Sequence, residues 1–318
     1  MSLSSSIFRR GWYKVLRRFI KLHVSHNVQP NRTELTRKDL LFSLFDATGL
    51  GLEIGPSFNP LVPKAGGYKV EILDHLSAAN LREKYKSAPN VDLSKIEEVD
   101  YVSDGGSILK LIGKYQHYDY IIASHVIEHT TDLLGFISDC EQLLNDKGVL
   151  VLAVPDKRFA FDCLRSYSTT GQILQAHLEK RQRHTPGQVF DEVAYNCLRD
   201  GEIAWKNGDS GPLSFFRQLS DAKAVFEGLQ QNDIFYDIHA WQFTPASFRL
   251  VMNDLFEIGA ICLRENSFHE TVGHEFFISL SKSGTGCSVD RLLLAECSIS
   301  EQKAITVHSH KQISRSDL

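Results

Sequence analysis

The 318-residue sequence lacks the features that define several protein classes. It contains no run near the roughly 18 consecutive apolar residues that a membrane-spanning helix needs, so we do not expect an integral membrane protein. Its six cysteines include no CxxC pair, which argues against a zinc ribbon and predicts free thiols in a reducing, cytoplasmic compartment. With 42% hydrophobic and 23% charged residues, the composition is that of an ordinary globular protein.

Acidic residues are absent from the first 33 positions, which carry seven basic ones. The remainder therefore holds 28 basic and 39 acidic side chains, a balance of −11. Because phosphate contacts are made by Lys and Arg, a body this acidic argues against a nucleic-acid partner.

The N-terminal segment, residues 1–45, is interpreted as a basic amphipathic helix followed by a linker. Apolar residues recur at helical spacing on one face, with Arg and Lys on the other; they are Phe8, Trp12, Val15, Leu16 and Phe19. Three interpretations remain open: packing against the body, peripheral contact with an anionic membrane surface, or an organelle transit peptide.

From residue 46 the pattern becomes an alternation of short apolar runs and amphipathic helical stretches. The predicted strands are 49–54, 68–74, 99–104, 118–124 and 149–155. Nearly continuous apolar strands separated by helices predict a parallel sheet that is covered on both faces.

The second half interrupts this alternation and then resumes it. Residues 159–240 are polar and predict a mostly helical insertion. Thr244 then caps a helix that starts at Pro245, and two strands, 260–265 and 274–282, follow with too short a link for a crossover helix, so they should pair antiparallel. We expect residues 283–318 to form a flexible tail.

Several strand-end motifs resemble those of one enzyme family. "LEIGPSFNP" is an acidic residue followed by a glycine loop, "YDYIIASHVIEHTTD" is a strand followed by an EH pair, and "LLNDKGVLVLAVPD" is a helix, turn and strand. These segments resemble the class I, Rossmann-like S-adenosylmethionine-dependent methyltransferases. The resemblance implies an α/β fold, a doubly wound seven-stranded sheet with an antiparallel last strand, whose core is 46–158 and 241–282.

The resemblance also implies a set of cofactor-binding residues at the carboxyl ends of the strands, where open α/β sheets bind ligands. Gly55 lets the backbone approach the methionine part, Asp74 accepts the ribose hydroxyls, and Asp104 accepts from the adenine amino group. Glu53 places negative charge near the cofactor's ammonium. The expected set is completed by Pro56, Ser124 and His125. Asp74 and Asp104 as helix caps, and Glu53 as a residue that orients the loop, remain alternatives.

The glycine loop departs from the family pattern. The usual Gly-x-Gly-x-Gly is replaced here by Gly-Pro-Ser-Phe-Asn at 55–59. The residues that follow contain two prolines and two glycines before position 68, which predicts a loop or a single turn instead of a first crossover helix.

Two other motifs invite different interpretations. His125 to His129 spells HxxEH, an inverted zinc-protease signature, but that motif needs both histidines on one helix, and the strand at 118–124 leads straight into His125. We therefore expect no metal. "GLGLEIG" suggests a dinucleotide site with Asp74 at the right distance, but the GxGxxG turn that opens a helix is missing.

Methylation of a hydroxyl requires a base, and three residues are candidates: His125, Asp156 and His239. The string "GLEIGPSFNPLVPK", with "PDKRFAFD" and "HAWQFTP", also resembles a bacterial subgroup associated with glycosyltransferases, which suggests polysaccharide biosynthesis. The sequence thus predicts O-methylation of a glycan, nucleotide-sugar or other small-molecule acceptor held by the insertion. A non-catalytic binding or scaffold subunit and an NAD(P)-dependent enzyme remain alternatives, and the oligomeric state stays open.

Overall fold

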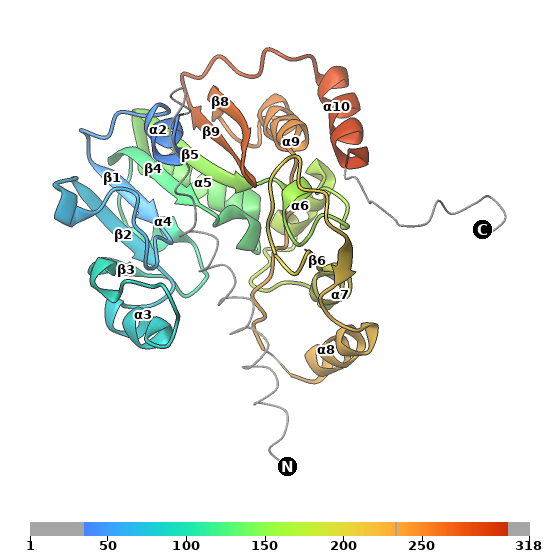
Figure 1. The fold of residues 1–318 in the computed structure, drawn as a ribbon. Helices are drawn as coiled ribbons and strands as arrows, with labels where there is room; N and C mark the ends of the chain where they lie inside the picture. Colours follow the sequence, from blue (N-terminus) through green and yellow to red (C-terminus); the bar gives the residue numbers. More distant parts are fainter. Residues whose placement is uncertain (1–34, 233, 305–318) are drawn as a thin grey trace.

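The computed structural model describes residues 35–232 and 234–304, which are built around one seven-stranded sheet (Figure 1). The strands follow the order β3-β2-β1-β4-β5-β9-β8. Their bounds are β1 (Gly51–Ile54), β2 (Val70–Asp74), β3 (Tyr101–Val102), β4 (Tyr118–Ser124), β5 (Leu144–Pro155), β8 (Arg264–Val272) and β9 (Glu275–Ser281). The pairs among β1–β5 are parallel, and β9 is antiparallel to both β5 and β8. The predicted fold class is confirmed.

Both faces of the sheet are covered by buried apolar clusters. A strand can contribute to both clusters, because successive side chains point to opposite faces. In β4, Ile121 belongs to one buried apolar cluster, whereas Tyr120 and Ile122 belong to another. Gly51 in β1 is required by this packing, since a Cβ there would lie 2.0 Å from the Tyr120 ring. The sheet is therefore the wall between two cores.

The helices of the main body begin at well-formed caps. Asp132 caps α5 through Gly135 N, and Thr244 forms a capping box at the start of α9, as predicted. The bounds are α2 (Arg37–Phe42), α3 (Ala78–Tyr85), α4 (Ile108–Ile112), α5 (Leu133–Leu143) and α9 (Pro245–Glu257), with short 3₁₀ turns η2 (Leu93–Lys95) and η3 (Ile127–His129). Between β1 and β2 there is only the single 3₁₀ turn η1 (Lys64–Gly66), which confirms the prediction for the first crossover.

The segment between β5 and α9 is mostly helical, with one small sheet. It contains the 3₁₀ turn η4 (Lys157–Phe159), α6 (Thr170–Leu178), α7 (Pro186–Tyr195), α8 (Leu219–Gln231) and the antiparallel pair β6 (Cys197–Arg199) and β7 (Leu213–Phe215). Helix α6 packs against α5 and α9, while α7 packs against α8. Figure 1 shows α7 and α8 grouped to one side of the main sheet.

Two expectations for the C-terminal part are wrong. The first strand of the final pair is β8, which starts at Arg264, later than the predicted 260–265. Residues 291–303 are not a flexible tail but form α10 (Arg291–Lys303), which packs against α9. Asp290 caps this helix, and Arg291 pairs with Asp254 at 2.6 Å.

The expected N-terminal helix over residues 1–33 and the end of the tail, 305–318, lie outside the described residues. Among the helices in the described ranges, none is long and apolar enough to cross a bilayer.

The packing of α10 predicts unequal effects for two neighbouring leucines. Leu294 is 2% exposed and Leu292 is 69% exposed. Leu294→Ala should lower the free energy of unfolding by about 2–3 kcal/mol, and Leu292→Ala by less than about 0.5 kcal/mol. Urea unfolding of both variants tests this. Equal effects would show that α10 is not part of the folded core.

Candidate functional site

A cavity of about 990 Å³ lies at the carboxyl ends of β1, β2 and β4. Its lining continues from the strand ends to residues of the inserted segment and of the 235–239 loop. Cavities for ligands span roughly 300–1,000 Å³, so this one has the volume expected for a large ligand or for two ligands. Its position is the one that open α/β sheets use, where the strand order reverses between β1 and β4.

The glycine loop follows β1 directly and turns sharply at the cavity wall. Gly55 has a φ of +68°, a backbone conformation that favours glycine, and a Cβ there would lie 3.0 Å from Val126 Cγ2. Ser57 also has a positive φ, and its N–H donates to Asp74 Oδ2 at 2.8 Å. Gly55 and Pro56 therefore present their backbone to the cavity as a loop held by Asp74.

Asp74 ends β2 and lies at the cavity wall with only 1% of its surface exposed. It accepts hydrogen bonds from the N–H of Ser57 and from the N–H and ring of His75. A carboxylate has about four acceptor positions, so it keeps capacity for a further donor. The cap of α3 is Ser77, which excludes Asp74 as that cap.

Asp104 also lines the cavity and is exposed. It accepts from Gly106 N at 2.9 Å, but the cap of α4 is Ser107. The helix-cap alternative is therefore wrong for Asp104 as well as for Asp74.

Glu53 is 3% exposed, and its oxygens accept from Leu61 N at 2.7 Å and Val62 N at 3.1 Å. Burial raises the pKa of Glu53 to about 7, against the lowering effect of these two hydrogen bonds. These contacts favour the interpretation that Glu53 orients the loop that replaces the first crossover helix.

Ser124 ends β4 and His125 follows it, beside an ion-pair network that sequence reasoning missed. His125 has a φ of +53°, and its Nε2 lies 3.0 Å from Glu275 Oε2. Arg37 donates to both oxygens of Glu275, at 2.5 and 2.9 Å, and to Ser124 Oγ at 2.7 Å. The one available signal was Glu275 itself, an acid at the start of the apolar run "EFFISLS".

Burial of Glu275 alone would raise its pKa, but the hydrogen bond from His125 and the charge of Arg37 outweigh burial and hold its pKa well below the usual range. The network therefore requires an ionised Glu275. It ties the end of β4 to β9 and to α2.

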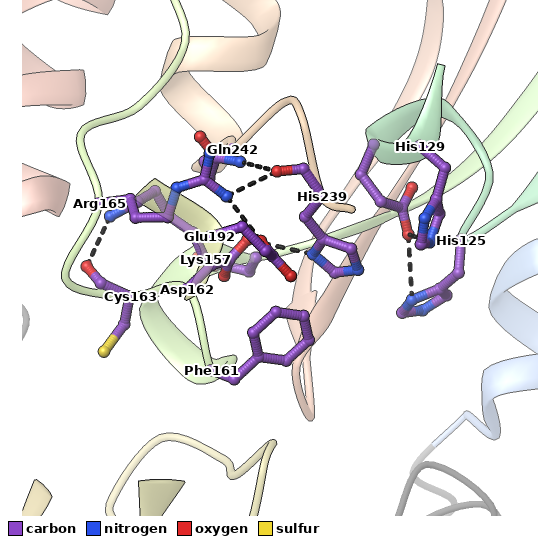
Figure 2. A network of polar contacts seen from close by, with 12 residues as sticks. His125, His129, Lys157, Phe161, Asp162, Cys163, Arg165, Glu192, His239 and Gln242 are labelled. Carbon is purple, nitrogen blue, oxygen red and sulfur yellow. Dashed lines mark hydrogen bonds and ion pairs between the residues drawn. The ribbon is translucent and has the colours of Figure 1, made fainter. Parts of the chain in front are cut away.

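His239 lies in the loop before α9, where it lines the cavity next to His129 (Figure 2). It is 3% exposed, and its Nδ1 lies 3.1 Å from Asp162 Oδ2. Burial would raise the pKa of Asp162, but the bond from His239 and the nearby cations lower it. Arg165 donates to the His239 carbonyl at 2.6 Å and to Glu192 at 2.8 Å, which fixes the loop.

His129, at the end of η3, packs edge to face on His239 with ring centroids 4.8 Å apart. Its Nδ1 lies 2.9 Å from Asp237 Oδ1. Burial disfavours a charged ring, but Asp237 and Glu128 outweigh it and raise the pKa of His129 to about 9. His129 lines the cavity.

Asp156 does not belong to this site, which corrects its place among the candidate bases. It is fully buried, pairs with Arg158 at 2.6 Å and accepts from Thr271 Oγ1 at 2.6 Å, and it is absent from the cavity lining. The inverted zinc-protease interpretation also fails, because His125 precedes η3 and shares no helix with His129.

The comparisons with known proteins identify the family. A family model described as a methyltransferase domain matches residues 39–200, just over half of the chain. The protein is a member of the methyltransferase-domain family. A search of curated sequences finds no match.

Solved structures similar to this methyltransferase share little sequence with it. A methyltransferase from Mesorhizobium loti, described as S-adenosylmethionine-dependent, is 11% identical, with TM-score 0.41 over 76% of this chain and 94% of that one. A putative zinc-dependent alcohol dehydrogenase from Rhodobacter sphaeroides is 12% identical, with TM-score 0.40 over 85% and 97%. The CMeT domain of the citrinin polyketide synthase is 14% identical, with TM-score 0.35 over 74% of this chain and 46% of that one. These TM-scores are too low to add to the assignment.

The methyltransferase uses S-adenosylmethionine as its cofactor, as the sequence predicted. The site fits this group, because Gly55 leaves the backbone open to a close approach and Asp74 keeps acceptor positions at the cavity wall. The NAD(P)-dependent alternative is thereby set aside.

The Glu275 network predicts a pH-dependent stability. A carboxyl whose pKa is depressed by folding stabilises the protein above its unfolded pKa, near 4.5, and this contribution is lost as the pH falls. Glu275→Gln should therefore cost about 3 kcal/mol at pH 7 and flatten the loss of stability as the pH falls from about 5 to about 3. Glu83→Gln, with a 68% exposed side chain, is the control and should match wild type within about 0.5 kcal/mol.

Urea unfolding across this pH range measures the effect. If Glu275→Gln keeps the wild-type pH slope, the carboxyl is not ionised in the folded protein and the network described above is wrong.

Proposed function

We propose that the protein transfers the methyl group of S-adenosylmethionine to a hydroxyl of a glycan, nucleotide-sugar or other small-molecule acceptor. The observation that carries this proposal is the shape of the cavity. One continuous space joins the strand ends, with Gly55, Asp74 and Asp104, to the inserted segment and His239. A cofactor at the strand ends would leave the other half of the space for an acceptor.

The reaction itself is an in-line displacement. The acceptor oxygen forms a bond to the methyl carbon, the carbon–sulfur bond breaks with its electron pair left on sulfur, and the hydroxyl proton must pass to a base. The cofactor supplies the activated methyl group, while the protein supplies alignment and the proton acceptor.

His239 is the best placed of the candidate bases. Because Asp162 is ionised and accepts only, the Nδ1 of His239 must carry the proton that bonds to it. That tautomer leaves a lone pair on Nε2 for the hydroxyl proton. His125 is less suited, since its Nε2 is engaged by Glu275 and its Nδ1 lies 3.6 Å from Glu128.

The chemistry of the acceptor half supports a sugar that carries negative charge. Its lining combines aromatic side chains, which stack on sugar rings, with guanidinium groups, which bind phosphates; these residues include Phe216, Phe235, Tyr236, Arg181 and Arg217. An acceptor of this kind agrees with the resemblance to methyltransferases associated with glycosyltransferases. We extend the proposal to a role in polysaccharide biosynthesis in the cytoplasm, which agrees with six free cysteines.

Cofactor binding should depend on Asp74. Asp74→Ala removes a charge-assisted contact to the ribose hydroxyls and should weaken S-adenosylmethionine binding by about 2 kcal/mol, or about 30-fold. Calorimetric titration measures this, and a thermal melt checks that the variant is folded. Unchanged affinity in a folded variant would contradict the assignment of Asp74.

Methyl transfer should depend on His239 without loss of cofactor binding. With a tritium-labelled methyl donor and a panel of nucleotide sugars and oligosaccharides, His239→Gln should lower kcat by about 100-fold or more and leave cofactor affinity within about 2-fold. His117→Gln, an exposed histidine outside the cavity, is the matched control. Transfer by His239→Gln at the wild-type rate, or transfer to nitrogen or sulfur acceptors alone, would overturn the proposal.

A further inference from the structure

Glu128 is a buried carboxylate without a hydrogen-bond partner. It is 1% exposed, and neither of its oxygens has a hydrogen-bond partner among the residues that the structure describes. The nearest ring nitrogens lie beyond hydrogen-bond distance, His125 Nδ1 at 3.6 Å and His129 Nε2 at 3.9 Å. Burying a carboxylate whose oxygens receive no hydrogen bond is costly, so a ligand that binds directly to these oxygens would stabilise the site.

Two histidines beside Glu128 are oriented as metal-bound histidines are, each by a carboxylate at Nδ1. His129 directs Nδ1 to Asp237, and His239 directs Nδ1 to Asp162. In each pair the carboxylate oxygen accepts from Nδ1, which directs Nε2 of the ring away from the carboxylate. A carboxylate that orients a histidine and leaves Nε2 to coordinate is the usual outer shell of a metal site.

We propose that Glu128, His129 and His239 form a binding site for a divalent transition-metal cation. One ligand atom from each residue lies within 4.8 Å of those from the other two. Tetrahedral ligands at bond lengths of about 2.0–2.1 Å lie roughly 3.4 Å apart, so the three side chains would close inward by about 1 Å on binding. Figure 2 shows His239 between the buried polar cluster and the pair His125 and His129.

The ligand set favours a particular class of cation. Two imidazoles and one carboxylate suit zinc, iron(II) or cobalt(II), whereas magnesium and calcium prefer oxygen ligands alone. Three protein ligands also leave coordination positions open, as in catalytic sites, and His129 and His239 both line the cavity.

The sequence led us to expect no metal in the protein, because the one ligand set that it offered was the HxxEH motif with His125 and His129. The proposed set differs, since it takes His129 from η3 and His239 from a loop 110 positions later. HxxEH therefore contributes its Glu and its second His only.

The role of the cation in catalysis rests on the proposed function. A metal-bound hydroxyl loses its proton more readily than a free one. In the metal-loaded enzyme the acceptor oxygen would take an open coordination position, and its proton would pass to water in the cavity. Nε2 of His239 would then be a ligand and not the proton acceptor.

Metal binding by the full-length protein, stripped with a chelator, tests the proposal without any acceptor. Titration with cobalt(II) should saturate at one equivalent per chain and give the visible absorption bands of a bound, low-symmetry cobalt ion. Added zinc should displace the cobalt and remove these bands. Glu128→Gln preserves the shape of the side chain and should weaken zinc binding by more than the roughly 10–100-fold typical of changes in the outer shell. Asp237→Asn should weaken it by about 10-fold.

Two controls keep the result specific. His117→Gln should leave the affinity unchanged, and a thermal melt shows that each variant is folded. Stoichiometric binding that survives Glu128→Gln overturns the proposal. Metal bound by His308 and His310, near the C-terminus, would give this result. Absence of stoichiometric binding also overturns it.

The outcome is separable from that of the proposed function. Cofactor affinity and methyl transfer are measured on the metal-free protein. If transfer depends on His239 but no metal binds, the metal site is wrong and the proposed function stands. If metal binds but no hydroxyl acceptor is methylated, the metal site stands and the proposed function is wrong.

Discussion

The parallel pairing of β1 with β4 is the constraint on which the cavity depends. Ile54 pairs with Ala123, so the two chains leave the sheet side by side, one into the Gly55 loop and the other into Ser124 and His125. Since strand order reverses at this pair, the following segments diverge and leave a space between them. The contact between the Gly55 position and Val126 shows how closely the two loops approach at the base of this space.

Buried carboxylates hold the walls of the cavity in place, and they differ in their hydrogen-bond and ion-pair partners. Asp74 is stabilised by backbone N–H groups, Glu275 by Arg37 and His125, and Asp162 by His239. Glu128 is the exception, because its oxygens receive no hydrogen bond from the described residues. Removing one partner of a buried pair costs about 3–5 kcal/mol, so these networks stabilise the arrangement of the residues that they join. Alignment of two reactants benefits from such an arrangement.

Local patterns predicted the elements that are buried on both sides. The runs at 118–124 and 149–155, the apolar face from Leu133 to Leu143 and the Thr244–Pro245 cap all correspond to observed elements. β8 was misplaced because it is an edge strand rich in polar residues, with little apolar signal. Helix α10 was missed because Leu292, Leu293 and Leu294 are consecutive and give no helical period.

Contacts between distant residues account for the features of the site that the sequence did not show. Glu275 lies 150 positions from His125, and Asp162 lies 77 from His239, so no spacing rule brings them together. Asp156 follows a strand end, as a functional residue does, but Arg158 and Thr271 enclose it. Position at a strand end was sufficient to predict residues that line the cavity, whereas the lining that comes from the inserted segment required the three-dimensional structure.

The most direct test is a crystal structure of the full-length protein with S-adenosylhomocysteine, the product of methyl transfer. The account predicts that the ribose hydroxyls lie against Asp74, that the methionine part passes Gly55, and that the sulfur faces the half of the cavity lined by His239. A product bound elsewhere, or bound with its sulfur turned away from His239, would contradict it.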